Sequence, residues 1–384
     1  MNGKLTIAVI FGGQSPEHDV SRMSACSVIK NIDKEKYNVV TIGINKQGKW
    51  LNYNGPAQLI ENGEWETEAK KHAKTSDNIN MFKYVSGKIF QPNKEHKAIE
   101  PRRFLEFIGA ENNDIKIDVV FPVLHGCNGE DGTVQGFFEL MDIPYVGAEV
   151  LSSAVGMDKY YSKVVFEKAN IPQADYLLIT RKDIETNEDD IIKQIEDKFD
   201  YPCFVKPCNA GSSIGITKAH DRKELICGLK TAVKYDRKIL AEEYIDGREI
   251  ECSVLGNDKP QASTVGEIIP ANEFYDYDAK YNDTGSKLII PAELPLNVIQ
   301  DIRDYATKAF KAIDCSGFAR VDFFVDKGSN KIYINEINTI PGFTNISMYP
   351  KLWEASGVSY TELIDKLIKL AIERHKENKR EYNR

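Results

Sequence analysis

Two strands that would pair with each other constrain the fold of this chain more than any other segment. Residues 317–325 (Gly-Phe-Ala-Arg-Val-Asp-Phe-Phe-Val) repeat with a period of two, as expected of a strand with one buried face. The sequence Gly328-Ser329-Asn330 is typical of a three-residue hairpin loop, after which residues 331–338 return. Pairing about Ser329 places Asp322 opposite Glu336, with Asn338 two residues further along the same face.

The polar face of this hairpin has the ligands of a hard metal ion. It combines two carboxylates, an amide and Arg320, and oxygen ligands of this kind suit magnesium, which completes its shell with nucleotide phosphates. Without a metal ion the two facing carboxylates would repel each other. The alternative is a surface hairpin with solvated charges, but the strands are too apolar for an exposed ribbon. The hairpin therefore predicts a magnesium and nucleotide site.

Two glycine-containing turns extend this prediction. Gly342 follows Pro341 just after the hairpin, where its N–H could approach a ligand closely and, with Arg320, face a developing oxyanion. Lys206 directly follows a strand expected at 201–205 and precedes the loop Gly211-Ser212-Ser213-Ile214-Gly215, whose backbone amides could wrap phosphates. This order of lysine and glycines is not that of a P-loop. On this stretch alone, a flexible loop is an equal alternative.

The segments at 15–17 and 125–132 each allow two interpretations. Glu17 is expected in the first turn of a helix capped by Ser15, with Pro16 at its first position, where it either complements the helix dipole or holds a substrate ammonium group. His125 follows a strand expected at 117–124 and either contacts a substrate or belongs to a capped turn in which Glu130 and Asp131 favour the next helix.

Two further segments also allow two interpretations each. The acidic residues 241–249 either bind an adenosine group or form an exposed strand end. The aromatic and charged residues 274–281 either form an active-site lid or a loop anchored by its aromatic side chains.

The order of the elements predicts a mixed α/β protein. A strand at 5–11, a glycine turn and a helix form an open α/β unit, and further helices are expected at 151–170, 223–235, 298–313 and around 363–371. Because 384 residues exceed the size of one core, we expect several units. These are an N-terminal parallel-sheet domain (1–147), a central unit with the phosphate loop (148–246), and a C-terminal unit with the metal hairpin and lid loop (247–384).

Composition excludes several classes of partner. The net charge of -8 argues against nucleic acid, and no apolar run approaches the roughly 20 residues that cross a bilayer. The first residues lack the layout of a signal peptide. Seven scattered cysteines without a Cys-x-x-Cys pair fit free thiols in a reducing cytoplasm.

In their order and spacing, these motifs resemble the D-alanine–D-alanine ligases, a branch of the ATP-grasp superfamily. The resemblance covers nearly the whole chain and is carried by Phe11-Gly12-Gly13, the loop 125–132, Met157-Asp158-Lys159, Val205-Lys206-Pro207 with 211–213, residues 275–281, and 335–344. It implies a two-subdomain ATP-grasp fold after the N-terminal domain. It also implies ligation of two D-alanines through an acyl phosphate for peptidoglycan synthesis, with ATP, two Mg²⁺ or Mn²⁺ ions, and a cytoplasmic homodimer.

The resemblance further implies roles for residues at matching positions. Catalytic roles fall to Glu17, Ser212, Tyr281, Arg320 and Gly342, of which Glu17, Ser212 and Tyr281 would form a hydrogen-bonded set. Substrate contacts fall to His125, Lys280, Ser347 and Met348. ATP contacts fall to Lys159, Lys206, Ser213, Glu242, Glu243, Tyr244, Ile245, Glu249 and Phe324. The metal ligands are Asp322, Glu336 and Asn338.

Two rival functions stay open at this point. Tyrosine at position 281 favours a dipeptide product over a D-lactate depsipeptide, but Asn345-Ile346 departs from the Ser-His of many members beside the second-substrate pocket. A D-Ala–D-Ser ligase is therefore one rival. A non-catalytic ATP-binding regulator is the other, although such a protein should have lost Arg320 or a metal ligand.

Overall fold

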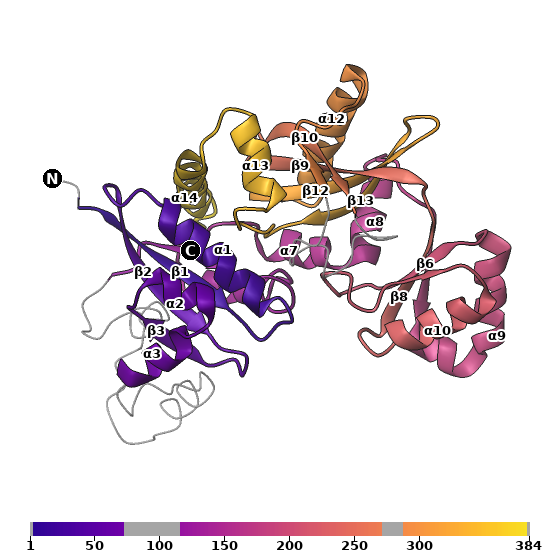
Figure 1. Ribbon diagram of the computed structural model, residues 1–384, viewed down its shortest axis with the longest axis horizontal. Helices are drawn as coiled ribbons and strands as arrows, with labels where there is room; N and C mark the ends of the chain where they lie inside the picture. The colour runs from indigo at the N-terminus through magenta and orange to yellow at the C-terminus, as the bar shows by residue number, and fades with distance from the viewer. Residues whose placement is uncertain (1–2, 73–115, 271–286, 382–384) are drawn as a thin grey trace.

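Three β-sheets organise the protein in the computed structural model, which describes residues 3–72, 116–270 and 287–381. Figure 1 shows a central sheet, drawn in orange, between an indigo N-terminal sheet and a pink to salmon sheet. The mixed α/β class predicted from the sequence is confirmed.

The N-terminal sheet has the strand order β3-β2-β1-β4. Its strands are β1 (Leu5–Gly12), β2 (Tyr37–Ile44), β3 (Trp50–Tyr53) and β4 (Val119–Val123). β1 runs parallel to β2 and β4, and its residues are almost all buried, as expected of a central parallel strand. β3 pairs antiparallel at the edge. Within residues 3–72 and 116–147, the helices are α1 (His18–Asn31), α2 (Ala57–Asn62), α3 (Trp65–His72) and α6 (Thr133–Leu140).

Helix α1 begins two residues later than the sequence predicts, because Ser15 caps a preceding turn instead of the helix. The Ser15 Oγ accepts a hydrogen bond from the Glu17 N–H (3.1 Å), and the His18 N–H donates to the Ser15 carbonyl. A serine can satisfy one isolated turn as well as a helix end, so that sequence alone does not separate the two. Glu17 consequently occupies the N-cap position.

The pink to salmon sheet has the order β5-β8-β6-β7, with antiparallel pairing throughout. It consists of β5 (Tyr176–Thr180), β6 (Cys203–Pro207), β7 (Thr217–Ala219) and β8 (Lys238–Glu243). Apolar residues of α9 (Arg181–Lys198) and α10 (Arg222–Ala232) share one core with β6 and β8. This small unit carries the loop 208–216 at one end of β6.

The central sheet is antiparallel, with the order β11-β10-β9-β12-β13. Its strands are β9 (Gly247–Gly256), β10 (Gln261–Ile269), β11 (Lys287–Ile289), β12 (Gly317–Asp326) and β13 (Ile332–Asn338). Helix α12 (Leu296–Ala312) buries its apolar face in the same core as Val321 and Phe323. The opposite face of β12 therefore remains available for polar side chains.

The helix predicted at 151–170 is two helices, α7 (Val150–Met157) and α8 (Lys159–Lys168). The chain turns at Asp158, whose carboxylate caps α8 by accepting from the N–H groups of Tyr160 and Tyr161. Asp158 also forms an ion pair with Lys238 of β8. An aspartate in an otherwise helical pattern is a possible N-cap, and here a contact 80 residues away holds it in that role.

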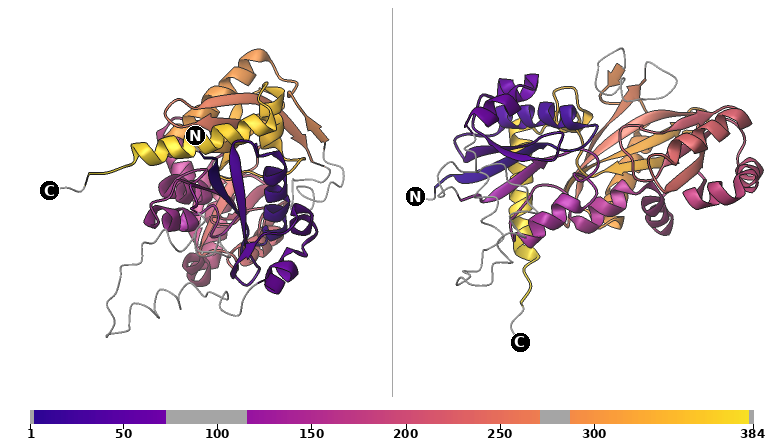
Figure 2. Two further views of the ribbon diagram at one scale, coloured as in Figure 1. Left: turned by 90° about the vertical axis from the view of Figure 1, so that its left-hand side faces the viewer. Right: turned by 90° about the horizontal axis from the view of Figure 1, so that it is seen from below.

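The C-terminal helices return to the N-terminal sheet. α13 (Met348–Ala355) precedes α14 (Tyr360–Glu377), and Figure 2 shows α14 lying alongside the first sheet. Leu363, Ile364 and Leu367 of α14 belong to the same core as Ile7 and Val9 of β1. The apolar periodicity predicted for this helix is thus explained by packing against β1, which lies more than 300 residues away in the sequence.

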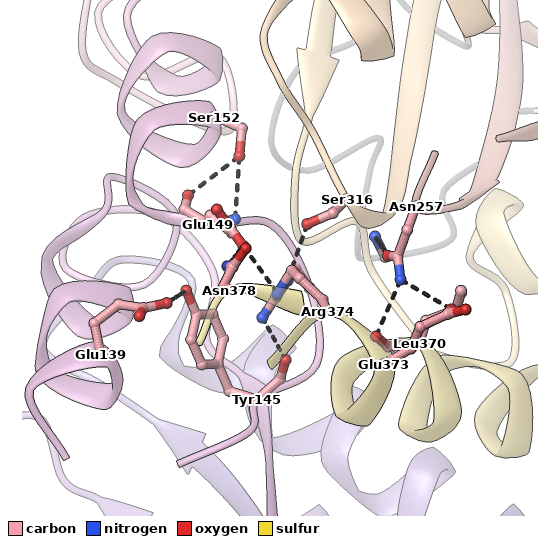
Figure 3. A network of polar contacts seen from close by, with 12 residues as sticks. Glu139, Tyr145, Glu149, Ser152, Asn257, Ser316, Leu370, Glu373, Arg374 and Asn378 are labelled. Atoms are coloured by element: carbon pink, nitrogen blue, oxygen red, sulfur yellow. Dashed lines mark hydrogen bonds and ion pairs between the residues drawn. The ribbon is translucent and has the colours of Figure 1, made fainter. Parts of the chain in front are cut away.

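Arg374 joins α14 to residues 145–149, which precede and begin the approach to α7 (Figure 3). This buried guanidinium donates to the carbonyls of Tyr145 (2.8 Å) and Gly147 and to the Ser316 Oγ (3.0 Å). It also pairs with Glu149 (3.2 Å). Five donors in a rigid fork suit this convergence of acceptors, so that Arg374 ties β12, α14 and residues 145–149 together.

Among the described residues, no helix is long and apolar enough to cross a membrane. The seven cysteines are free thiols, as the sequence predicts.

Candidate active site

The hairpin of β12 and β13 presents a row of polar side chains on one face. Asp322 pairs with Glu336 and Arg320 pairs with Asn338, which confirms the predicted register. The loop of the hairpin spans four residues, 327–330, whereas the sequence predicts three. The pairing register therefore shifts once along the hairpin, at a bulge that follows Asp322.

Cations neutralise the carboxylates of this row. Arg320 donates to both Asp322 oxygens (2.7 Å each) and lies 3.0 Å from Glu251, while Lys159 lies 3.5 Å from Glu336. Burial opposes the guanidinium charge, but Asp322 and Glu251 outweigh it and raise the pKa of Arg320 well above its usual range. The predicted repulsion between Asp322 and Glu336 is therefore relieved by these cations within the protein.

Glu251 is a member of the site that the sequence did not single out. It lies on β9 directly opposite Asp322, and its side chain is buried. The sequence of β9 alternates between polar and apolar residues, which places Glu251 on its polar face. The pairing of β9 with β12, however, joins segments about 70 residues apart, and no local pattern specifies it.

The loop after β6 approaches the hairpin with left-handed backbone. Ser212 and Ser213 have positive φ values of 49° and 60°, which turn successive peptide groups in an unusual direction for non-glycine residues. Lys159 Nζ donates to the carbonyl of Ala210 (2.9 Å) and so holds the start of this loop. Left-handed residues in a turn can aim consecutive N–H groups at an anion, so this backbone is compatible with the phosphate loop predicted from the sequence.

Glu17 joins the N-terminal sheet to this loop. Its carboxylate accepts a hydrogen bond from the Ser212 Oγ. Two glycines make room for it: a Cβ at Gly126 would lie 2.4 Å, and one at Gly211 3.0 Å, from the Glu17 Oε2. The predicted Glu17–Ser212 pair is thus in contact, whereas Tyr281 and Lys280 lie outside the described residues.

Glu242 is buried between two lysines. Its oxygens lie 2.5 Å from Lys163 Nζ and 2.5 Å from Lys206 Nζ. Burial opposes ionisation of Glu242, yet Lys163 and Lys206 together lower its pKa to about 2. Glu242 therefore holds the position and charge of Lys206, and Lys163 is a second residue that sequence reasoning missed.

His125 and Glu130 lie between the N-terminal sheet and the segment after β13. His125 Nδ1 lies 3.0 Å from the Ile340 carbonyl oxygen and its Nε2 3.2 Å from the Ser24 Oγ. Burial lowers the pKa of His125, so the imidazole is neutral at pH 7. Glu130 accepts from the N–H groups of Gly126 (2.6 Å) and Ile340 (3.3 Å). Burial and the nearby Glu17 carboxylate raise the pKa of Glu130 to about 8.

Gly342 lies against Ser347 at the start of α13. A Cβ at Gly342 would lie 2.8 Å from the Ser347 Oγ, so the close approach requires glycine. The Ser347 Oγ accepts from the Thr344 N–H (3.0 Å), which fixes the turn, and Met348 is buried beside Ile268.

Two adjoining cavities meet at the hairpin. One lies beside Glu17, His125, Gly342 and Ser347, and the other beside Lys206, Tyr244, Glu249 and Phe324. Both are lined by Lys159, Ser212, Glu251, Arg320 and Glu336. Every predicted site residue within the described part of the chain lines one of these cavities. The arrangement can hold a polyanion next to a smaller polar molecule, with cations at the junction.

Comparisons with known proteins point to one family. Residues 6–148 match the family model of the D-ala D-ala ligase N-terminus, and residues 165–369 match that of the D-ala D-ala ligase C-terminus. A D-alanine–D-alanine ligase of Acetivibrio thermocellus is 58% identical over 385 residues, covering 100% of both chains.

Solved structures agree with the sequence comparison. The VanG D-Ala:D-Ser ligase of Enterococcus faecalis has a TM-score of 0.79 at 38% identity, covering 96% of this chain and 100% of that one. A D-alanine–D-alanine ligase of Bacillus anthracis complexed with ATP has a TM-score of 0.70 at 30% identity, covering 98% of this chain and 100% of that one.

Replacing Glu242 with glutamine should lower the free energy of unfolding by about 3 kcal/mol at pH 7, because its pKa falls from an ordinary 4.5 to about 2 and each unit corresponds to about 1.4 kcal/mol. The folded-state pKa is the lower one, so this stabilisation is present above about pH 4.5 and is lost as the pH falls through about 2. Urea unfolding between pH 7 and pH 3 should show the difference from wild type shrinking. Glu243→Gln, at an exposed neighbour, is the control. A pH-independent difference would contradict the ion-pair assignment.

Proposed function

The chain belongs to the D-alanine–D-alanine ligase family, and we propose on that premise that it joins two D-alanines to D-alanyl-D-alanine while converting ATP to ADP and phosphate. The observation that carries this proposal is the meeting of two cavities at Arg320 and Glu336, one beside the serine-rich loop and one beside Glu17 and Gly342. Such an arrangement brings a phosphate and a carboxylate to one point.

The cavity beside Lys206 is the proposed nucleotide site. Lys159 and Lys206 would offset the phosphate charge, and the N–H groups around Ser213 would contact phosphate oxygens. Tyr244, Ile245 and Phe324 would line the base, with Glu243 and Glu249 as polar contacts. Glu242 acts in this proposal through Lys206, since both its oxygens face lysines.

Magnesium fits the donor set of the hairpin. Asp322, Glu336 and Asn338 offer two carboxylates and an amide on one face of the sheet, and Asp322 and Asn338 are already in contact (3.0 Å). Oxygen ligands in this number match those that magnesium takes beside nucleotide phosphates. We propose that these three residues hold two Mg²⁺ or Mn²⁺ ions, which when bound neutralise phosphate charge and polarise the transferred group.

The reaction proposed for this site has two steps. A carboxylate oxygen of the first D-alanine, whose ammonium group Glu17 would hold, attacks the γ-phosphorus of ATP, and ADP leaves. The amine of the second D-alanine, near Ser347 and Met348, attacks the acyl phosphate carbon, and the tetrahedral oxyanion releases phosphate as it collapses. Arg320 and the Gly342 N–H would stabilise that oxyanion.

The setting of the reaction is also part of the proposal. We place the protein in the cytoplasm as a homodimer that supplies D-alanyl-D-alanine for peptidoglycan precursors. D-Serine is the competing second substrate, because the chain is similar to a D-Ala:D-Ser ligase and a serine hydroxyl adds little to the volume of alanine.

Product analysis tests the proposed reaction directly. Purified protein with ATP, Mg²⁺ and an equimolar mixture of D-alanine, D-serine and D-lactate should yield D-alanyl-D-alanine as the main product in mass spectrometry. D-Alanine alone should suffice for phosphate release. Phosphate release that requires D-serine or D-lactate would show that the second substrate is assigned wrongly, and ATP binding without turnover would indicate a regulator.

Glu336→Ala should lower turnover by at least about 100-fold, because the loss of a metal ligand removes several kcal/mol of charge stabilisation. Its urea unfolding midpoint should stay close to that of wild type, since the side chain is only half-buried. Lys331→Ala, at the exposed end of the same hairpin, is the matched control. Near-normal turnover of the Glu336 variant would show that the metal is held elsewhere.

A further inference from the structure

The segment that carries Gly342 is held from outside by the N-terminal unit. Residues 340–343 lie beyond the end of β13 at Asn338. The strand pairing of the hairpin therefore does not set the orientation of their peptide groups. Three side chains of the N-terminal unit contact them: Ser24 of α1, and His125 and Glu130 of the loop after β4.

These contacts lie on both sides of Gly342. On one side, Ile340 makes two hydrogen bonds through its backbone. Its N–H donates to the Glu130 Oε1 (3.3 Å), and its carbonyl oxygen lies 3.0 Å from His125 Nδ1. On the other side, the Phe343 N–H donates to the Ser24 Oγ (3.1 Å). The direction of the Gly342 N–H is therefore constrained from both neighbours along the chain.

The hydrogen bonds among these groups have one consistent direction. A carbonyl only accepts, so the His125 proton is on Nδ1 and is donated to Ile340. His125 Nε2 then accepts from the Ser24 hydroxyl, 3.2 Å away, which leaves the Ser24 oxygen free to accept from Phe343. Both nitrogens of this neutral, buried imidazole are thus used in hydrogen bonds to Ile340 and Ser24, so His125 acts by positioning these groups.

Glu130 is distinguished from its neighbour by what it contacts. Asp131 accepts from the N–H groups of Asn128 (2.8 Å) and Thr133 (3.0 Å), which stabilises its own loop and the start of α6 as the helix-dipole interpretation requires. Glu130 instead accepts from the N–H groups of Gly126 and of Ile340, which is 210 residues away. A carboxyl group whose two oxygens accept from N–H groups of distant segments fixes one segment relative to the other.

We propose that Glu130 is a positioning residue for amide formation, and that together with His125 and Ser24 it orients the Gly342 N–H towards the oxyanion of the second step. The inference rests on the proposed function, which places that oxyanion at Arg320 and Gly342. A displacement of about 1 Å at such a donor is enough to cost about 100-fold in rate. Because Glu130 contacts neither the phosphate loop nor the hairpin carboxylates in the hydrogen bonds described, ATP binding should not depend on it.

Two substitutions at Glu130 test this role. Glu130→Met removes both acceptors and should lower kcat about 100-fold, with the KM for ATP within twofold of wild type. Glu130→Gln retains one acceptor oxygen, and its kcat should be about tenfold higher than that of Glu130→Met. Asp131→Asn, in the adjacent residue of the same loop, should keep kcat within twofold.

A rapid-quench measurement separates positioning from a general loss of structure. If Glu130 acts only in amide formation, the Met variant should form about one equivalent of ADP per site at the wild-type rate in the first turnover and then slow down. A first-turnover ADP rate that falls in proportion to kcat, or a kcat within twofold of wild type, would overturn the proposal. Failure of the proposed function is distinct, because wild-type protein would then form no dipeptide.

Discussion

The pairing of β12 with β9 on one side and β13 on the other is the constraint on which the site depends. Antiparallel register places Asp322 between Glu251 and Glu336, and it places Arg320 beside Asn338. Because successive side chains of a strand alternate between faces, a slip by one residue would bury these charges and expose Val321 and Phe323. The core under α12 thus fixes the register of these strands, and the register determines which side chains face the site.

Around this sheet, four buried or half-buried carboxylates of the site are matched with cations. Arg320 serves Asp322 and Glu251, Lys159 serves Glu336, and Lys163 and Lys206 share Glu242. These pairs place the positive charges next to where the proposed function needs them, at phosphate and oxyanion. Of these lysines, Lys159 and Lys206 would also contact the nucleotide in the proposed function.

Local patterns were sufficient for the hairpin, because Asp322 and Glu336 lie on neighbouring strands joined by a short loop. They also indicated a turn at the glycines and serines around Ser212, because the backbone conformation of a turn depends on the local sequence. They could not reveal Glu251, Lys163 or the span from Glu130 to Ile340, since these contacts arise when distant segments pack together.

The late start of α1 follows from the local turn that Ser15 caps, whereas the break at Asp158 depends on a distant contact. A capping side chain permits a helix end, and at Asp158 the tertiary contact with Lys238 decides that it occurs.

The central claim is that the two cavities bring a D-alanine carboxylate onto the γ-phosphate of ATP. Turnover with D-alanine labelled with ¹⁸O in both carboxylate oxygens tests it most directly, with the released phosphate examined by mass spectrometry. An acyl phosphate requires that one labelled oxygen pass from the carboxylate to phosphate in each turnover. Unlabelled phosphate, or label in AMP, would contradict this account of the site.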